Sequence, residues 1–66
     1  MYWSIPVKEW CDGIALQCGV MVVQGTHDEA RDQITQRAAQ LPDDYYVAPF
    51  AQMRGPFNTE AEARAI

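Results

Sequence analysis

Two cysteines and one histidine are the residues of this chain best suited to act as nucleophile, general base or metal ligand. Nucleophilic catalysis needs the nucleophile beside a histidine that a third group orients, and structural zinc takes four ligands in tight spacings such as C-x2-C. Cys11 and Cys18 form a C-x6-C spacing, and His27 stands at the expected start of a helix, where a solvated residue is common. We therefore expect no catalytic residue, no metal site and no cofactor, with a small enzyme that uses these three residues as an alternative.

Carboxylates offer a second kind of chemistry, which is binding to a basic surface. The chain carries 9 acidic and 5 basic residues, a net charge of −4. Such a chain is poorly suited to bind nucleic-acid phosphates directly and better suited to meet a basic protein surface. Acidic residues gather on one predicted helix and just beyond its end: Asp28, Glu29, Asp32, Asp43 and Asp44. Either they form a solvated face, or they space charges as a phosphate backbone does and act as a decoy for a DNA- or RNA-binding cleft.

Residues 2–24 are predicted to form one β-hairpin. The Asp-Gly dipeptide at positions 12–13, flanked by apolar residues, is typical of a two-residue type I′ turn. If this dipeptide is the loop, each residue i faces residue 25 − i, so Val7 lies opposite Cys18. Pro6 cannot donate to a strand ladder, which indicates a bulge or an edge there. In this register one face is almost entirely apolar, and it includes Ile14, Leu16 and Val22. The other face is mixed and includes Tyr2, Trp10, Met21 and Val23.

The mixed face of the hairpin is a candidate binding surface. The last helix could cover it through Phe57 and Ile66, a dimer could bury it, or it could be exposed to a partner. Exposed aromatic side chains are frequent binding hot spots. Arg54, at the tip of a proline-bounded loop, is a further candidate contact. The predicted partner-binding residues are therefore Asp28, Glu29, Asp32, Asp43, Asp44, Trp10, Tyr2 and Arg54.

The residues after the hairpin predict two helices and a third strand. Thr26 and Glu29 match a capping box, and the helix is expected to run to about residue 41, because Pro42 stops it. Its inward-facing residues are expected to be Ala30, Ile34, Ala38 and Leu41. Residues 45–48 are read as a short strand and residues 49–56 as a loop. A second capping box opens a last helix over residues 60–66.

These elements predict a small α+β fold, with residues 1–66 forming a single domain. The order is ββαβ with a short C-terminal helix, and the sheet is three-stranded and antiparallel in the order 2-1-3. An order 1-2-3 with a parallel pair is the alternative. A chain of this length buries only ~60% of its extended surface, so the core is small.

Charge, hydropathy and cysteine spacing predict a cytoplasmic protein, in a bacterial host cell if it is phage-encoded. The longest strictly apolar run is far shorter than the ~20 residues of a membrane span, and the N-terminus lacks the pattern of a signal peptide. In the predicted register Cys11 and Cys18 are roughly 13 Å apart, beyond disulfide reach. We expect a monomer or a weak homodimer with no membrane partner.

Two resemblances to known families guide the functional hypothesis. The segment Gln-Gly-Thr-His-Asp-Glu-Ala at positions 24–30, followed by Ile34 and Ala38, resembles the strand-to-helix junction of HicB-type antitoxins, which bind and block an RNA-cleaving toxin. In size, acidity and α+β pattern the chain resembles phage-encoded inhibitors of bacterial defence, anti-CRISPR proteins among them. That resemblance implies a non-enzymatic inhibitor of a larger basic protein or nucleoprotein complex, such as a CRISPR effector. A HicB-like antitoxin and a structural accessory subunit are the alternatives.

Overall fold

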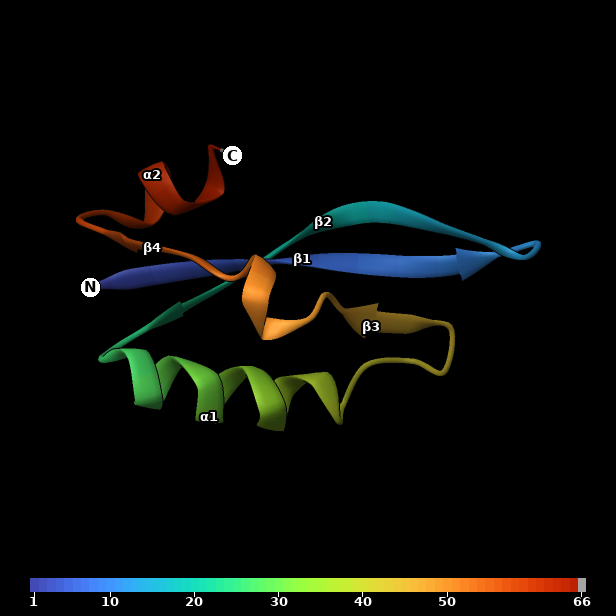
Figure 1. Cartoon of the computed structure of the whole chain (residues 1–66), viewed down its shortest axis with the longest axis horizontal. Helices are drawn as coiled ribbons and strands as arrows, with labels where there is room; N and C mark the ends of the chain where they lie inside the picture. The colour runs from blue at the N-terminus through green and yellow to red at the C-terminus, as the bar shows by residue number, and fades with distance from the viewer. Residues whose placement is uncertain (66) are drawn as a thin grey trace.

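A long antiparallel β-hairpin forms the centre of the structure (Figure 1). The computed structural model describes residues 1–65. Strand β1 (Tyr2–Cys11) runs to the turn and β2 (Ile14–Gln24) returns. Asp12 and Gly13 both have positive φ, 51° and 80°. The predicted two-residue turn is therefore confirmed, since a type I′ turn requires that conformation at both positions.

The pairing of the two strands changes partway along the hairpin. From the tip the predicted register is correct as far as Lys8, which lies opposite Gln17, but Val7 then lies opposite Gly19. Cys18 is the extra residue of a β-bulge, a device that inserts one residue into one strand of a pair. The predicted register is wrong beyond this point, because a bulge exchanges the faces of all residues that follow it. Val23, predicted for the mixed face, therefore takes the place on the core face that was predicted for Val22.

The sheet has four strands rather than the three predicted. Strand β3 (Tyr45–Val47) pairs antiparallel with β1, which confirms the order β2-β1-β3. Residues 49–56 were predicted to be a loop, but they contain a 3-10 turn (Phe50–Gln52) and the start of β4 (Arg54–Phe57). β4 pairs with the first residues of β1. Gly55 and Pro56 favour a loop when only the neighbouring residues are considered. The segment is nevertheless a strand, because it pairs with the open edge of β1.

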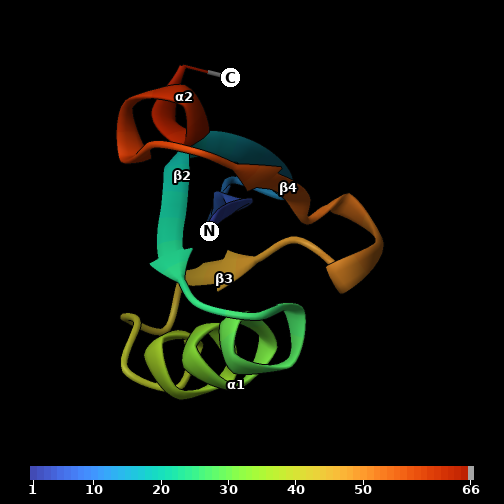
Figure 2. The ribbon, with the colours of Figure 1, turned by 90° about the vertical axis from the view of Figure 1, so that its left-hand side faces the viewer.

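The two helices lie on opposite faces of the sheet (Figure 2). Helix α1 (His27–Ala38) has the predicted capping box: Glu29 N donates to Thr26 Oγ1 at 3.2 Å, and Thr26 N donates to Glu29 Oε1 at 3.0 Å. The helix ends about three residues earlier than predicted, because the amide of Gln40 bonds three residues back to Arg37 O and tightens the last turn.

Helix α2 (Glu60–Arg64) has only half of its predicted capping box. Glu62 N donates to Thr59 Oγ1 at 3.1 Å, while the Glu62 carboxylate accepts a bond from the Thr59 hydroxyl. The predicted end of this helix at Ile66, and the contact predicted for Ile66, lie outside the described residues. Within residues 1–65, no helix has the length and apolar character needed to cross a bilayer.

The core lies between the sheet and α1. Ile5 and Val23 from the hairpin pack with Ala30 and Ile34 from α1, and all four are at most 2% exposed. Met21 packs against this cluster from the same face. Met21 and Val23 were predicted to lie on the mixed face, and the bulge at Cys18 accounts for both errors. We call the face that α1 covers the α1 face, and the other the α2 face.

The hairpin extends well beyond both helices (Figure 1). The molecule measures 37 × 22 × 17 Å. Helix α1 has 12 residues and is roughly 18 Å long, whereas the 11 residues of β2 span roughly 36 Å. One helix therefore covers only half of the hairpin. We call residues 8–17, on the far side of the bulge, the distal hairpin.

Candidate functional site

Two aromatic side chains are exposed where the distal hairpin meets β3. Trp10 is 54% exposed and Tyr46 is 38% exposed. Tyr46 lies opposite Lys8, and Asp44 lies opposite Trp10, whose amide donates to Asp44 O at 2.8 Å. Residues opposite one another in a sheet project from the same face. Trp10, Tyr46, Lys8 and Asp44 therefore share the α2 face, and we call these four residues the distal aromatic surface.

The distal aromatic surface combines large apolar area with charges of both signs. Asp43, which is exposed, stands beside Asp44 at the end of the α1–β3 loop. Arg54 lies opposite Ser4 on the same face, nearer to α2, and borders a small hollow of about 130 Å³ together with Pro6. Four of the predicted binding residues, Trp10, Asp43, Asp44 and Arg54, thus belong to or lie near one face of the sheet.

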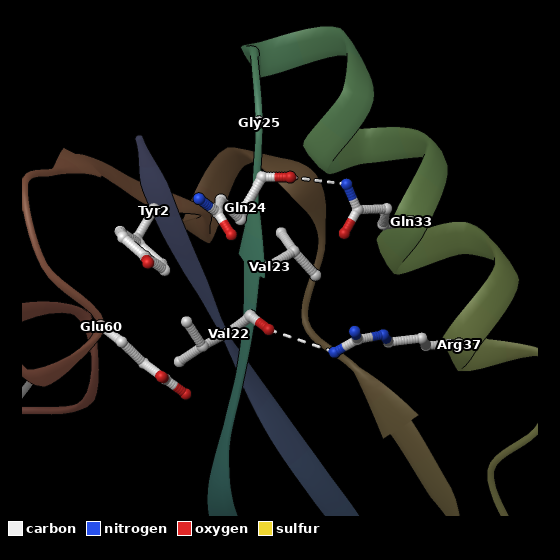
Figure 3. A pocket seen from close by; sticks show the side chains of 8 residues that line it. All are labelled: Tyr2, Val22, Val23, Gln24, Gly25, Gln33, Arg37 and Glu60. Carbon is white, nitrogen blue, oxygen red and sulfur yellow. Dashed lines mark hydrogen bonds between the residues drawn. The ribbon is translucent and has the colours of Figure 1, made fainter.

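Tyr2 is not part of this surface. It is half-buried at the opposite end of β1, roughly 26 Å from Trp10 at the usual strand rise. There it borders a larger hollow of about 550 Å³ between α1 and α2 (Figure 3). Arg37 on one wall donates to Val22 O at 3.1 Å, and Glu60 on the other accepts from Arg64 at 2.8 Å. The charged groups of this hollow are therefore already engaged within the chain.

The acidic residues predicted on α1 do not form one surface with Asp43 and Asp44. They lie in the helix layer on the other side of the sheet from Trp10 (Figure 2). The Asp28 side chain is 96% exposed and available to a partner. The Glu29 carboxylate caps the helix, and hydrogen bonds from Thr26, first its backbone amide and then its side chain, hold the pKa of Glu29 below its ordinary value. Asp32 is exposed one helical turn beyond Asp28.

The cysteines and the histidine are not gathered into one site. Both thiols are free and exposed, and Cys18 Sγ lies 3.5 Å from Val7 O in the bulge. The His27 ring packs edge-on against Trp3 with 5.2 Å between ring centroids, at the opposite end of β1 from Cys11. Across residues 1–65, no group of three or more His, Cys, Asp or Glu side chains is arranged to hold a metal ion.

Three exposed side chains of the distal end were missed by the sequence analysis. Ile14 and Leu16, predicted for the core face, are 59% and 52% exposed, and Tyr46 was not singled out. The register of Ile14 and Leu16 was correct, but α1 does not reach them. The length of the predicted helix, compared with that of the predicted strands, was the signal that could have revealed this.

A tyrosine and a carboxylate interact on the α1 face of the distal hairpin. Glu9 lies opposite Tyr45 in the β1–β3 pairing. The negative charge of Glu9, and next a side-chain hydrogen bond to it, raise the pKa of the Tyr45 hydroxyl above its ordinary value. Glu9 and Tyr45 are both partly exposed to solvent. From this pair to the tip of the hairpin, α1 does not cover the α1 face.

Comparison with known proteins adds no relative. The chain matches no protein-family model, and neither curated proteins nor solved structures give a significant match.

Proposed function

We propose that this protein is a non-enzymatic binding protein of the anti-CRISPR type, which inhibits a larger, basic, nucleic-acid-handling complex in the cytoplasm of a bacterial host. The distal aromatic surface carries the proposal. Trp10 is the most exposed aromatic residue of the surface, and tryptophan and tyrosine dominate binding hot spots. Exposed aromatic area of this size, held on a rigid sheet, is costly in water and favourable in an interface.

The charge of the chain supports a basic partner. The net charge is −4, and Asp43 and Asp44 stand at the rim of the distal aromatic surface. Charges around an aromatic centre steer association and determine which partners are rejected. Asp28 and Asp32 add negative potential from the α1 layer without touching the same patch. Arg54 is placed to meet a carboxylate of the partner near the middle of the α2 face.

A plaque assay tests the proposal. The host carries a CRISPR–Cas system with a spacer against the infecting phage, and a panel of hosts covers the different system types. Expression of the wild-type chain is expected to restore plaques against at least one system, and Trp10→Ala is expected to abolish that restoration. Gln36→Ala, an exposed position on α1, is the matched control and keeps the activity. If no system in the panel is inhibited, the anti-CRISPR proposal fails.

Capture of the partner at two salt concentrations separates the contributions of charge and of aromatic contact. Exposed charge contacts are screened by salt, whereas an aromatic anchor is not. A nucleic-acid-handling complex that is retained by the wild-type chain and released by Trp10→Ala supports the proposed surface. If the captured protein is instead an RNase toxin whose toxicity is relieved by co-expression, the chain is a HicB-like antitoxin.

A further inference from the structure

The outer edge of β2 is open and carries no charge. β2 lies at the end of the sheet order β2-β1-β3, so one side of this 11-residue strand has no strand beside it within residues 1–65. Monomeric proteins usually protect such an edge with lysine, proline or a short strand. The chain has 9 acidic and 5 basic residues, but β2 contains none of them and no proline.

Side chains of α1 protect only the proximal end of this edge. Gln33 Nε2 donates to Gln24 O at 2.6 Å and Arg37 donates to Val22 O at 3.1 Å (Figure 3). These bonds show that the backbone groups of Val22 and Gln24 point away from β1. Because direction alternates along a strand, those of Val20 do as well.

Backbone N–H and C=O groups of β2 also point away from β1 in the distal hairpin. Ile14 pairs with Cys11 next to the turn, so the backbone groups of Ala15 and Gln17 point outward. Within residues 1–65, no side chain hydrogen-bonds to the backbone of Ala15, Gln17 or Val20. The open edge therefore runs from Ala15 to Val20.

We infer that two copies of this chain pair through their β2 edges, antiparallel and about a two-fold axis that passes between Cys18 and Gly19. A two-fold interface brings two copies of the same strand together, so every charge on β2 would enter the interface twice and would need an opposite charge at its paired position. An uncharged strand in a chain of net charge −4 meets that requirement. A different protein would not need β2 to be free of charge.

The outward-pointing groups select the register of the pairing. Gln17 of one copy lies opposite Val20 of the other, and both lie on the open edge. Ala15 lies opposite Val22, whose carbonyl oxygen accepts from Arg37 and has a second lone pair for the new ladder. In this register the two bulges face each other, so the extra residue of each copy does not interrupt the new ladder. A register with Ala15 opposite Gln24 and Gln17 opposite Val22 matches as many positions. It is less favourable, because it uses both of the carbonyl groups that α1 side chains already bond.

A dimer of this kind also accounts for the exposure of Ile14 and Leu16. A stable interface takes roughly 800 Å² from each partner, about a fifth of the 4421 Å² surface of this chain, and one strand edge alone does not supply that. The two-fold axis puts both α1 helices on the same side of the joint sheet. It also brings the proximal half of one copy beside the distal hairpin of the other. Ile14 and Leu16, which α1 of their own chain does not reach, are then beside α1 of the second copy.

Sedimentation equilibrium of the full chain is the primary test. The wild-type protein is expected to reach twice the 7.5 kDa chain mass as concentration rises. Gln17→Lys puts two added charges beside the axis and is expected to give a monomer, whereas the matched control Gln36→Lys, exposed on α1, stays dimeric. Ala15→Lys is the second variant should Gln17→Lys alter the circular dichroism spectrum. A wild-type monomer at all concentrations, or equal masses for the wild type and both β2 variants, overturns the inference.

Thiol cross-linking tests the register itself. In a Cys11→Ser background the sole remaining cysteine is Cys18, directly beside the axis. A short bis-maleimide is expected to produce a covalent dimer, and Gln17→Lys in that background is expected to lose it. Equal cross-linking in both proteins contradicts the pairing. Trp10→Ala is expected to dimerise as the wild type does, so a failure of this inference is distinct from a failure of the proposed function.

Discussion

The amide nitrogen of Trp10 lies 2.8 Å from the carbonyl oxygen of Asp44, which joins the last residues of β1 to the end of the α1–β3 loop. The bond is between backbone atoms, so it does not depend on which side chain stands at position 44. Charge at this surface can therefore be changed without moving the aromatic group.

Reversing the charge of the loop is expected to leave the fold intact. The double variant Asp43→Lys, Asp44→Lys alters two exposed side chains that accept no hydrogen bond in the described structure. Surface changes of this kind shift the free energy of unfolding by about 0.5 kcal/mol or less. Urea denaturation followed by circular dichroism checks this. A large loss of stability would show that the loop carboxylates hold the hairpin, and would weaken their assignment to partner binding.

The bulge at Cys18 predicts different costs for two neighbouring valines. Val23 is 2% exposed in the core, whereas Val22 is half-buried on the other face. Burying a valine side chain is worth roughly 1.5–3 kcal/mol, so Val23→Ala is expected to lower the free energy of unfolding by about that amount, and Val22→Ala by clearly less. Chemical denaturation of the two variants gives the comparison. The reverse order would indicate the regular register predicted from the sequence.

The capping box of α1 is expected to make a measurable contribution to stability. Thr26→Ala removes the acceptor for Glu29 N and is expected to cost about 1 kcal/mol in the free energy of unfolding. Thr35→Ala in the same helix is the matched control. Its hydroxyl donates to Arg31 O on an exposed turn, and alanine is the better helix former, so no loss is expected there.

Acid titration isolates the second half of that cap. The pKa of Glu29 is lowered in the folded chain, so its ionised form stabilises the fold above the unfolded-state value of 4.5, and this contribution is lost as pH falls through the lowered pKa. Glu29→Gln should therefore be less stable than the wild type at neutral pH, and the difference should shrink at low pH. Thermal unfolding at a series of pH values measures it. A difference that is constant with pH would mean that the charge of Glu29 plays no part.

Tyr45 is expected to ionise at higher pH than an ordinary tyrosine. Glu9 raises its pKa above 10.0, so the neutral hydroxyl contributes stability that is complete below pH 10.0 and is lost as pH rises through the folded-state pKa. Glu9→Gln should bring the pKa back toward 10.0. Absorbance titration in a Tyr2→Phe, Tyr46→Phe background observes Tyr45 alone. An unchanged midpoint in Glu9→Gln would contradict the pairing of these residues.

Two glycines are expected to respond oppositely to alanine. Gly55 has a φ of +137°, and a Cβ there would lie 2.8 Å from Trp3 Cε3 and 2.9 Å from Tyr2 O. Gly55→Ala should therefore destabilise the protein by more than about 1 kcal/mol, because both the backbone and the space are unsuitable. A Cβ at Gly19 would meet no atom within 4 Å, so Gly19→Ala should be neutral or slightly stabilising. Equal melting temperatures for the two variants would refute the close approach of β4 to Trp3.

Local chemistry in the sequence determined the hairpin turn, the start of both helices and the strand order. Asp12-Gly13 requires the positive φ values of a type I′ turn, and Thr26 with Glu29 forms a cap from atoms three residues apart. These features depend on neighbours along the chain, so the printed sequence contains all the information they need. The strand order followed from a general rule of chain topology, the right-handed crossover from β2 through α1 to β3, and from the need to close a small sheet.

Pro6 indicated a bulge or an edge nearby, but only the tertiary structure decided that the bulge forms at Cys18, that β4 is a strand and that the distal hairpin is exposed. Each depends on a balance between segments far apart in sequence. The bulge at Cys18 puts Val23 and Met21 under α1 at the cost of a regular ladder, and β4 forms because β1 offers an open edge. Ile14 and Leu16 have the alternation of a buried strand, yet they are exposed because the one helix on their face is too short to reach them. Periodicity tells which side chains share a face, but only packing decides whether anything covers that face.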